Sequence, residues 1–158
     1  MKKIIFTFLM LILFPVFSLA AEPTIRSDSS TFNPLSGVYN LQGNVFVQFP
    51  AHDKTLTITG NETKVNIYQL EVHGQGNIIL TYDNLNFHCD KVDVYHSERT
   101  AYVTGNIKFN TPKVTINADM GSFCWKTKLA SFKSNVTVNG KKQTGDVIYN
   151  VVEEKFVQ

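Results

Sequence analysis

Leu41-Gln42-Gly43-Asn44-Val45 is a five-residue pattern that recurs along this chain of 158 residues. Later copies read Gly74-Gln75-Gly76-Asn77-Ile78, Val103-Thr104-Gly105-Asn106-Ile107 and, in altered form, Phe132-Lys133-Ser134-Asn135-Val136. The Asn residues of successive copies lie 33, 29 and 29 positions apart. Self-similarity at a fixed period of this length is typical of stacked units, each of which buries the apolar face of the next. The pattern therefore predicts a repeat protein.

A second marker keeps step with the first. Asp28, Asp90 and Asp119 each lie 16 residues before a repeat Asn, and the last two each lie 13 residues after the preceding one. The repeating unit is therefore an Asp, a strand, a Gly-Asn pair and a second strand.

Apolar and polar residues alternate in almost every segment, and no segment shows helical spacing. Such alternation predicts strands with one buried face. One strand type carries its apolar stripe on Tyr39, Leu41, Gly43, Val45, Val47 and Phe49, and the other on Val114, Ile116, Ala118, Met120, Ser122 and Cys124. Turn signals such as Gly60-Asn61 and Asn139-Gly140 separate these runs. Strands of about four to eight residues at this spacing predict a single all-β domain: a jelly roll, a sandwich or a solenoid.

A small residue stands in the middle of each apolar stripe, namely Gly43, Gly76, Gly105 or Ser134. Glycine inside a strand indicates a bend or a bulge. It also leaves room for a ligand between two sheets, and the two interpretations are compatible.

The first twenty residues have the features of a secretory signal. Lys2 and Lys3 precede an apolar run, and Ser18-Leu19-Ala20 offers the small residues that a signal peptidase reads, so we expect cleavage after Ala20. A retained membrane anchor is the alternative, although Pro15 interrupts the run. Without the two lysines, 13 of the 15 basic side chains remain against 13 acidic ones. This balance gives no electrostatic basis for binding nucleic acid or an anionic membrane surface.

Motifs for catalysis or metal binding are absent from the sequence, which has no nucleophile elbow, no His-Glu-x-x-His and no phosphate-binding glycine loop. The densest polar cluster, residues 88–96, includes His88 and Cys89, but neighbouring residues of a strand point to opposite faces. We interpret it as a solvated strand end rather than a zinc site. We expect no enzyme, no cofactor and no metal.

The two cysteines occupy different repeat positions. Cys89 precedes its Asp by one residue and Cys124 follows its Asp by five. Six strand residues span about 20 Å, whereas a disulfide allows only about 4.4 to 6.8 Å between Cα atoms. We therefore expect two buried thiols.

Four segments, in order, carry a family resemblance: Ile25-Arg26-Ser27-Asp28, residues 38–47, Ile116-Asn117-Ala118-Asp119 and Gly145-Asp146-Val147-Ile148-Tyr149-Asn150. In this order and spacing the chain resembles the LptA/OstA family of periplasmic lipopolysaccharide-transport proteins, over nearly all of residues 21–158. It departs from the pattern at residues 50–63, where Thr63 stands in place of the Asp marker and the spacing lengthens from 13 to 19.

The resemblance implies an OstA-like twisted, incompletely closed β-jelly roll, built from stacked strand repeats as one domain over residues 21–158. It implies a periplasmic protein that binds lipopolysaccharide and joins head to tail, through unpaired terminal strands, into a bridge between inner-membrane LptC-like and outer-membrane LptD-like proteins. The acyl chains would then contact Leu41, Val45, Val47, Ile58, Ile107, Phe109, Ile116 and Met120.

Two alternatives stay open. An uncleaved apolar segment would make the chain an LptC-like membrane-anchored component of the same pathway. An interior filled completely by its own side chains would make it a structural β-repeat protein without a lipid ligand.

Overall fold

The structure, a computed structural model, describes residues 23–157. The expected signal segment and the cleavage site after Ala20 lie outside the described residues. Every regular element among residues 23–157 is a β-strand. The strands are β1 (Thr24–Arg26), β2 (Ser29–Asn33), β3 (Val38–Ala51), β4 (Lys54–Asn66), β5 (Glu71–Tyr82), β6 (Leu85–Tyr95), β7 (Thr100–Asn110), β8 (Thr115–Cys124), β9 (Leu129–Lys133), β10 (Thr137–Val138), β11 (Lys141–Lys142), β12 (Val147–Asn150) and β13 (Lys155–Val157).

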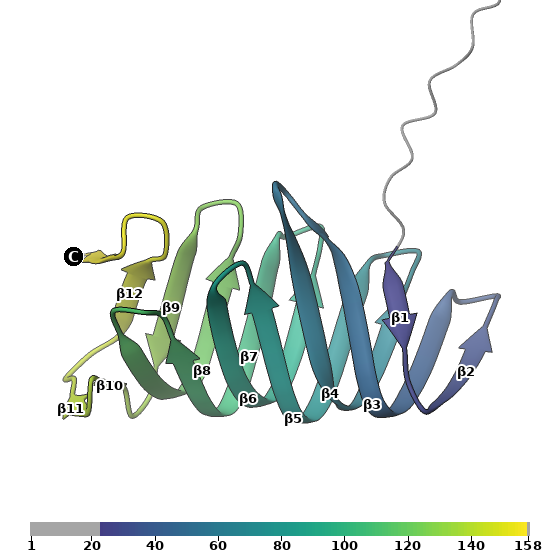
Figure 1. Ribbon diagram of the computed structural model, residues 1–158, viewed down its shortest axis with the longest axis horizontal. Helices are drawn as coiled ribbons and strands as arrows, with labels where there is room; N and C mark the ends of the chain where they lie inside the picture. Colours follow the sequence, from purple (N-terminus) through teal and green to yellow (C-terminus); the bar gives the residue numbers. More distant parts are fainter. Residues whose placement is uncertain (1–22, 158) are drawn as a thin grey trace, which may run out of the picture.

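These strands pair antiparallel in one sheet, in the order β1-β3-β4-β5-β6-β7-β8-β9-β12-β13. β2 pairs with β3 beside β1, and β10 pairs with both β8 and β11. β1 and β13 end up at opposite ends of the long axis, so the sheet does not close into a barrel (Figure 1). The expected all-β fold, a twisted and incompletely closed jelly roll, is confirmed.

The central strands are longer than the sequence predicted. β3 has 14 residues and β8 has 10, whereas four to eight were expected. Each long strand runs around a bend and contributes to both sides of the molecule, with the bends along one edge (Figure 1). Gly60-Asn61, interpreted above as a turn, is such a bend inside β4.

The repeat motif builds the bend. The pairing register shifts between Gln42 and Val45, so that Gly43 and Asn44 together face a single residue of β4, which is a β-bulge. Gly43 has φ of 72° and Asn44 has φ of 45°, both in the left-handed region. The side-chain amide of Asn44 donates a 2.8 Å hydrogen bond to Asp28. Of the two interpretations of the small residue, the bulge is confirmed.

Two later copies repeat this hydrogen bond. Asn106 donates to Asp90 at 2.7 Å and Asn135 donates to Asp119 at 2.6 Å. The 16-residue spacing seen in the sequence is therefore the spacing of a bonded pair of side chains.

In the second copy the marker position is not Thr63, which corrects the expectation from the sequence. A Cβ added to Gly76 would lie 3.1 Å from the amide nitrogen of Asn61, just as a Cβ on Gly105 would lie 2.4 Å from Asp90. Asn61, which lies 16 residues before Asn77, is thus the residue at the marker position. Thr63 instead faces the interior, 4% exposed, with no hydrogen-bond partner for its hydroxyl.

The bend changes which residues of a strand point inward. A Gly-Asn bend uses two residues, so the residues that point inward have the same odd or even numbering before and after it. Leu41 and Val45 are therefore both buried. An Asp bend uses one residue, so the inward residues change from even to odd numbers across it. β8 buries Ala118 before Asp119 and Phe123 after it. The expectation that Met120, Ser122 and Cys124 continue the inward stripe is therefore wrong.

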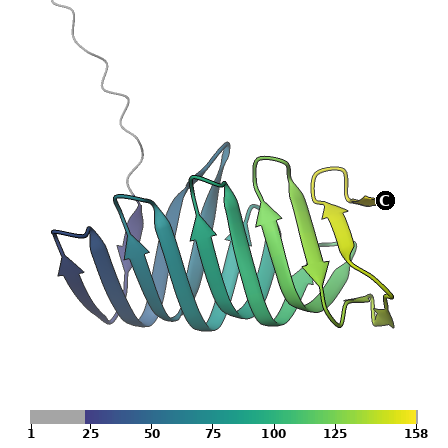
Figure 2. The ribbon, with the colours of Figure 1, turned by 180° about the vertical axis from the view of Figure 1, so that it is seen from behind.

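The bends divide the sheet into two facing layers (Figure 2). We call first layer the segments 45–51, 54–60, 78–82, 85–89, 107–110 and 115–118, together with β1, β10 and β11. We call second layer the segments 38–42, 62–66, 71–75, 91–95, 100–104 and 120–124, together with β2, β9, β12 and β13. The second layer ends in four-residue turns at 34–37, 67–70, 96–99, 125–128 and 151–154.

Aromatic side chains join the two layers in the interior. Phe87 and Phe109 of the first layer lie 6.1 and 5.2 Å, between ring centroids, from Phe132 of the second. Tyr82 lies 5.0 Å from Phe123 in the same way. The layers are thus held by burial of large apolar groups, the dominant favourable contribution to folding.

The two cysteines are free, as expected from their positions, but only Cys89 is buried. Burial raises the pKa of the Cys89 thiol to about 12. Cys124 is half-buried; burial raises its pKa, but hydrogen bonds from Thr127 and Lys126 outweigh burial and the net pKa is lowered. The reversed parity of β8 is what turns Cys124 toward solvent.

We expect a maleimide to label one thiol rapidly in the folded protein at neutral pH, because the thiolate is the reactive form and only Cys124 is both accessible and easily ionised. Mass spectrometry counts the labels. Cys124→Ser should remove the rapid label, and denaturant should expose the second thiol. Rapid labelling of Cys89 would contradict this burial.

Glycine-to-alanine substitutions test the bend by free energy of unfolding, measured with denaturant. Gly145→Ala should be nearly neutral, since the added methyl meets nothing within 4 Å. Gly140→Ala adds only the cost of a φ of 78°, about 1 kcal/mol. Gly105→Ala combines φ of 79° with a clash against Asp90, and should cost about 2 kcal/mol or more. Equal losses at Gly105 and Gly140 would mean that Asp90 does not constrain the bend.

Candidate functional site

Seven of the eight side chains predicted to contact acyl chains lie in one interior between the layers. Each is at most 2% exposed: Leu41, Val45, Val47, Ile58, Ile107, Phe109 and Ile116. Met120 is 51% exposed and faces away from the interior, because Asp119 reverses the parity of β8. Contact with a lipid stays a prediction for the seven.

The middle of this interior is filled by its own side chains. Phe87 and Phe109 have no exposed surface there. Toward the N-terminal end, Val47, Phe49, Val65 and Val72, with Pro23 and Leu70, border a void of about 10 Å³, which is no more than the space one water needs. The centre therefore has no preformed channel, and a guest must separate the layers there.

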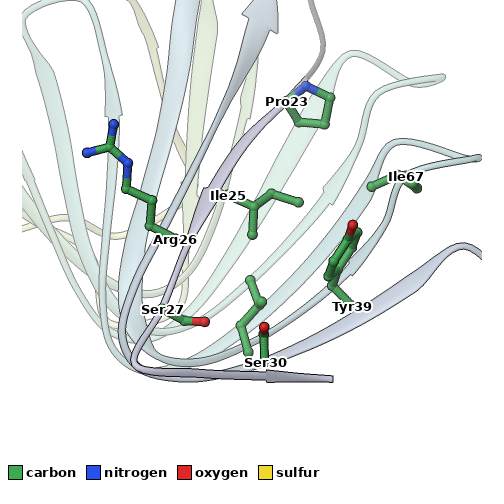
Figure 3. A pocket seen from close by; sticks show the side chains of 8 residues that line it. Pro23, Ile25, Arg26, Ser27, Ser30, Tyr39 and Ile67 are labelled. Carbon is green, nitrogen blue, oxygen red and sulfur yellow. The ribbon is translucent and has the colours of Figure 1, made fainter. Parts of the chain in front are cut away.

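At the N-terminal end the layers part and leave an opening of about 690 Å³. Its apolar wall comes from Ile25 of β1 in the first layer and from Tyr39, Leu41 and Ile67 of the second. Figure 3 shows Ile25 across the opening from Tyr39 and Ile67, while Arg26 extends from the other side of β1. The volume lies within the several hundred Å³ typical of small-molecule pockets.

The opening exists because the sheet is short at this end. β1 covers only three residues of β3, and β2 pairs with the other half of β3. Ser27 and Ser30 near the break between these two strands add polar groups beside the apolar wall. An apolar wall with a polar rim suits an amphiphilic ligand.

A second opening of about 490 Å³ lies at the C-terminal end. Val138 and Lys141 approach it from the first layer, and Val147, Ile148 and Phe156 from the second. The interior is therefore packed in the middle and opens between the layers at both ends.

On the side opposite the bends, the turns of the first layer face the turns of the second. We call this line of facing turns the mouth, and two ion pairs cross it. Lys128, in the second-layer turn 125–128, lies 3.0 Å from the carboxylate of Asp53 in the first-layer turn 52–53. Its ammonium also contacts the hydroxyl of Tyr82 and lies 4.8 Å from the centroid of that ring. Nearer the C-terminal end, Lys113 of the first layer pairs with Glu154 of the second.

The contacts of Lys128 keep both charges of its pair in place. Hydrogen bonds from Lys128 and then from His52 hold the pKa of Asp53 well below its usual range. Burial by itself lowers the pKa of Lys128, but the hydrogen bonds to Tyr82 and Asp53 outweigh burial and raise it. Sequence reasoning missed this pair, since nothing in the sequence links residues 75 positions apart.

Both ends of the sheet carry exposed apolar side chains beside unpaired strand edges. Phe32, Leu35 and Tyr68 lie at the N-terminal end, with Leu35 94% exposed. Val152 and Phe156 lie at the C-terminal end, with Val152 67% exposed. β12 pairs with β9 and β13 on its two sides, so the free edge of the second layer here is β13. Unpaired edges of this kind accept a further strand.

Residues 23–157 contain no group of three His, Cys, Asp or Glu side chains arranged to hold a metal ion. In the same part of the chain no helix is long and apolar enough to cross a membrane.

No family model matches the sequence, and no curated protein matches it. The structure is similar to the crystal structure of LptH from Pseudomonas aeruginosa, the LptA-homologous periplasmic component of a conserved lipopolysaccharide transport device. The two align with a TM-score of 0.58 and 14% identity, over 78% of this chain and 84% of that one. At this identity the likeness concerns the fold. The chain has the LptA-like twisted jelly-roll fold.

Proposed function

We propose that the protein is a periplasmic transport component that binds lipopolysaccharide and holds its acyl chains between the two layers. The observation that carries the proposal is the N-terminal opening, whose apolar wall at Ile25, Tyr39 and Leu41 continues into the buried interior. The similarity to LptH makes lipopolysaccharide the first ligand to test.

The energetics suit passage rather than storage. Burying an acyl chain is favourable by about 0.8 kcal/mol per methylene relative to water, and the chain gains about as much inside a membrane. Transfer between membrane and interior is therefore nearly balanced, and direction must come from partner proteins. In the packed centre, contacts with the chain would replace contacts between the layers.

The proposal includes the assembly that the resemblance implied. The first strands and β13 would pair end to end with further copies and with inner-membrane LptC-like and outer-membrane LptD-like proteins of the same fold. The proposal also includes a secreted, single-domain mature chain of residues 21–158, cleaved after Ala20. N-terminal sequencing of the mature protein separates this from an LptC-like anchored component.

The packed centre favours one competing function, a structural β-repeat protein that takes no lipid. The two functions differ at the openings. A structural protein needs no apolar opening, whereas a lipid carrier should contact its lipid at the openings first.

Photo-crosslinking distinguishes them. A benzoyl-phenylalanine placed at the half-buried Ile25, Tyr39 or Ile67 should capture lipopolysaccharide, because these side chains line the opening. The matched control is Met120, an apolar side chain that is exposed on the outer side, and Lys108 is a polar outward control. Labelling at Met120 as strong as at Ile25 would mean that lipid only adsorbs, and no labelling anywhere would favour the structural protein.

Sedimentation over a range of concentrations tests the assembly. The protein should form longer species as concentration rises, and Leu35→Glu and Val152→Glu should each shorten them by placing a charge in an end contact. Met120→Glu, a charge on an exposed apolar site away from the ends, should have no effect.

A mixture of the two end variants separates head-to-tail from symmetric contacts. Each variant keeps one intact end, so an equal mixture should form dimers but no chains if unlike ends meet. Dimers of either variant alone, but none gained on mixing, would show that like ends meet. A strictly monomeric wild-type protein would contradict self-association.

A further inference from the structure

Two ion pairs join the first layer to the second across the mouth, Lys128 with Asp53 and Lys113 with Glu154. The other ion pairs among residues 23–157 each stay within one layer or one turn. Lys54 at the start of β4 and Asp83 in the turn after β5, for example, both belong to the first layer and lie 3.3 Å apart. The two crossing pairs are therefore the electrostatic contacts that separation of the layers must break.

Lys128 is better placed than Lys113 to hold the two layers together. Its side chain is 21% exposed, against 67% for Lys113, but Asp53 is 54% exposed against 29% for Glu154. Water screens exposed pairs, so the advantage of Lys128 comes from its further contact with Tyr82, which is buried. Lys128 also has two partners in the first layer, Asp53 in the turn 52–53 and Tyr82 at the end of β5.

The backbone around Lys128 is fixed in its own layer. Its N–H donates a 2.8 Å hydrogen bond to the carbonyl of Cys124, and its carbonyl accepts a 3.0 Å bond from Val151. The side chain thus reaches across the mouth from a rigid turn, and a change in its contacts reports on the distance between the layers.

The contact lies over the packed part of the interior, between the two end openings. Trp125 of the same turn lies 6.5 Å, between ring centroids, from Phe49, which is three residues before the turn 52–53 that holds Asp53. Tyr82 itself packs on Phe123 of the second layer. An acyl chain can enter the centre only if these aromatic contacts part, and Lys128 spans the same gap.

We propose that the contact of Lys128 with Asp53 and Tyr82 is a clasp that holds the two layers shut over the apolar interior and opens when an acyl chain enters. The acyl chain as the guest rests on the proposed function, but the clasp itself does not. Its residues line neither opening, so removing it leaves the apolar walls intact.

Hydrogen exchange followed by mass spectrometry tests the clasp without any lipid. Lys128→Gln and Asp53→Asn should each increase the opening equilibrium about fivefold, the scale expected for one partly buried charged hydrogen bond. The faster exchange should be confined to peptides around residues 49–56, 80–84 and 123–130. Lys54→Gln is the matched control, since it removes an ion pair of the same region that stays within one layer. Exchange in Lys128→Gln equal to that in Lys54→Gln would overturn the clasp.

Uptake of parinaric acid, a fatty acid that fluoresces in apolar surroundings, tests the role in lipid access. The rate of the fluorescence rise should increase by a similar factor in Lys128→Gln and Asp53→Asn and stay unchanged in Lys54→Gln. Faster exchange without faster uptake would overturn the role in access while leaving the clasp supported. No uptake by any variant, wild type included, would count against the proposed lipid binding, and the exchange result would still decide the clasp.

Discussion

The bends in β3, β6, β7 and β8 share one local interaction, the hydrogen bond between a repeat Asn and an Asp 16 residues earlier. At the bends of β4 and β5, Asn61 takes the place of the Asp beside Gly76. The Asp lies against the glycine that precedes the repeat Asn. A Cβ added to Gly105 would come within 2.4 Å of the carboxylate of Asp90. Only glycine combines that close approach with a positive φ at low cost. Because the bends stack in register, a flat sheet becomes two layers with a shared interior.

The bend also decides which side chains the interior receives. Two residues at a Gly-Asn bend preserve the alternation, and one residue at an Asp bend reverses it, so both halves of every strand present apolar groups inward. Without the reversal, Met120, Ser122 and Cys124 of β8 would point inward, and Phe123, which has no exposed surface, would point to solvent. The number of residues at each bend therefore decides which side chains form the interior.

A packed centre with open ends suits a protein that passes apolar chains along rather than storing them. The aromatic contacts around Phe87, Phe109 and Phe132 stabilise the folded chain by itself. The openings at each end expose the continuation of the same apolar surface. Stability and access therefore occupy different parts of one interior, and access to the centre involves the mouth, where Lys128 joins the layers.

The sequence by itself determined the strands, the repeat and the position of most bends, because alternation and the Asn-to-Asp spacing are local properties of the chain. The same 16-residue spacing locates Asn61 rather than Thr63 at the marker position, since an Asn can replace the Asp beside a glycine. The alternation correctly predicted seven buried side chains of the interior. The prediction for Met120 was wrong because the alternation reverses at the Asp119 bend. Only the tertiary structure decided how the layers face each other. The end openings and the pairing of Lys128 with Asp53 depend on the relative offset of the layers, which arises from the twist of the whole sheet and leaves no pattern along the chain.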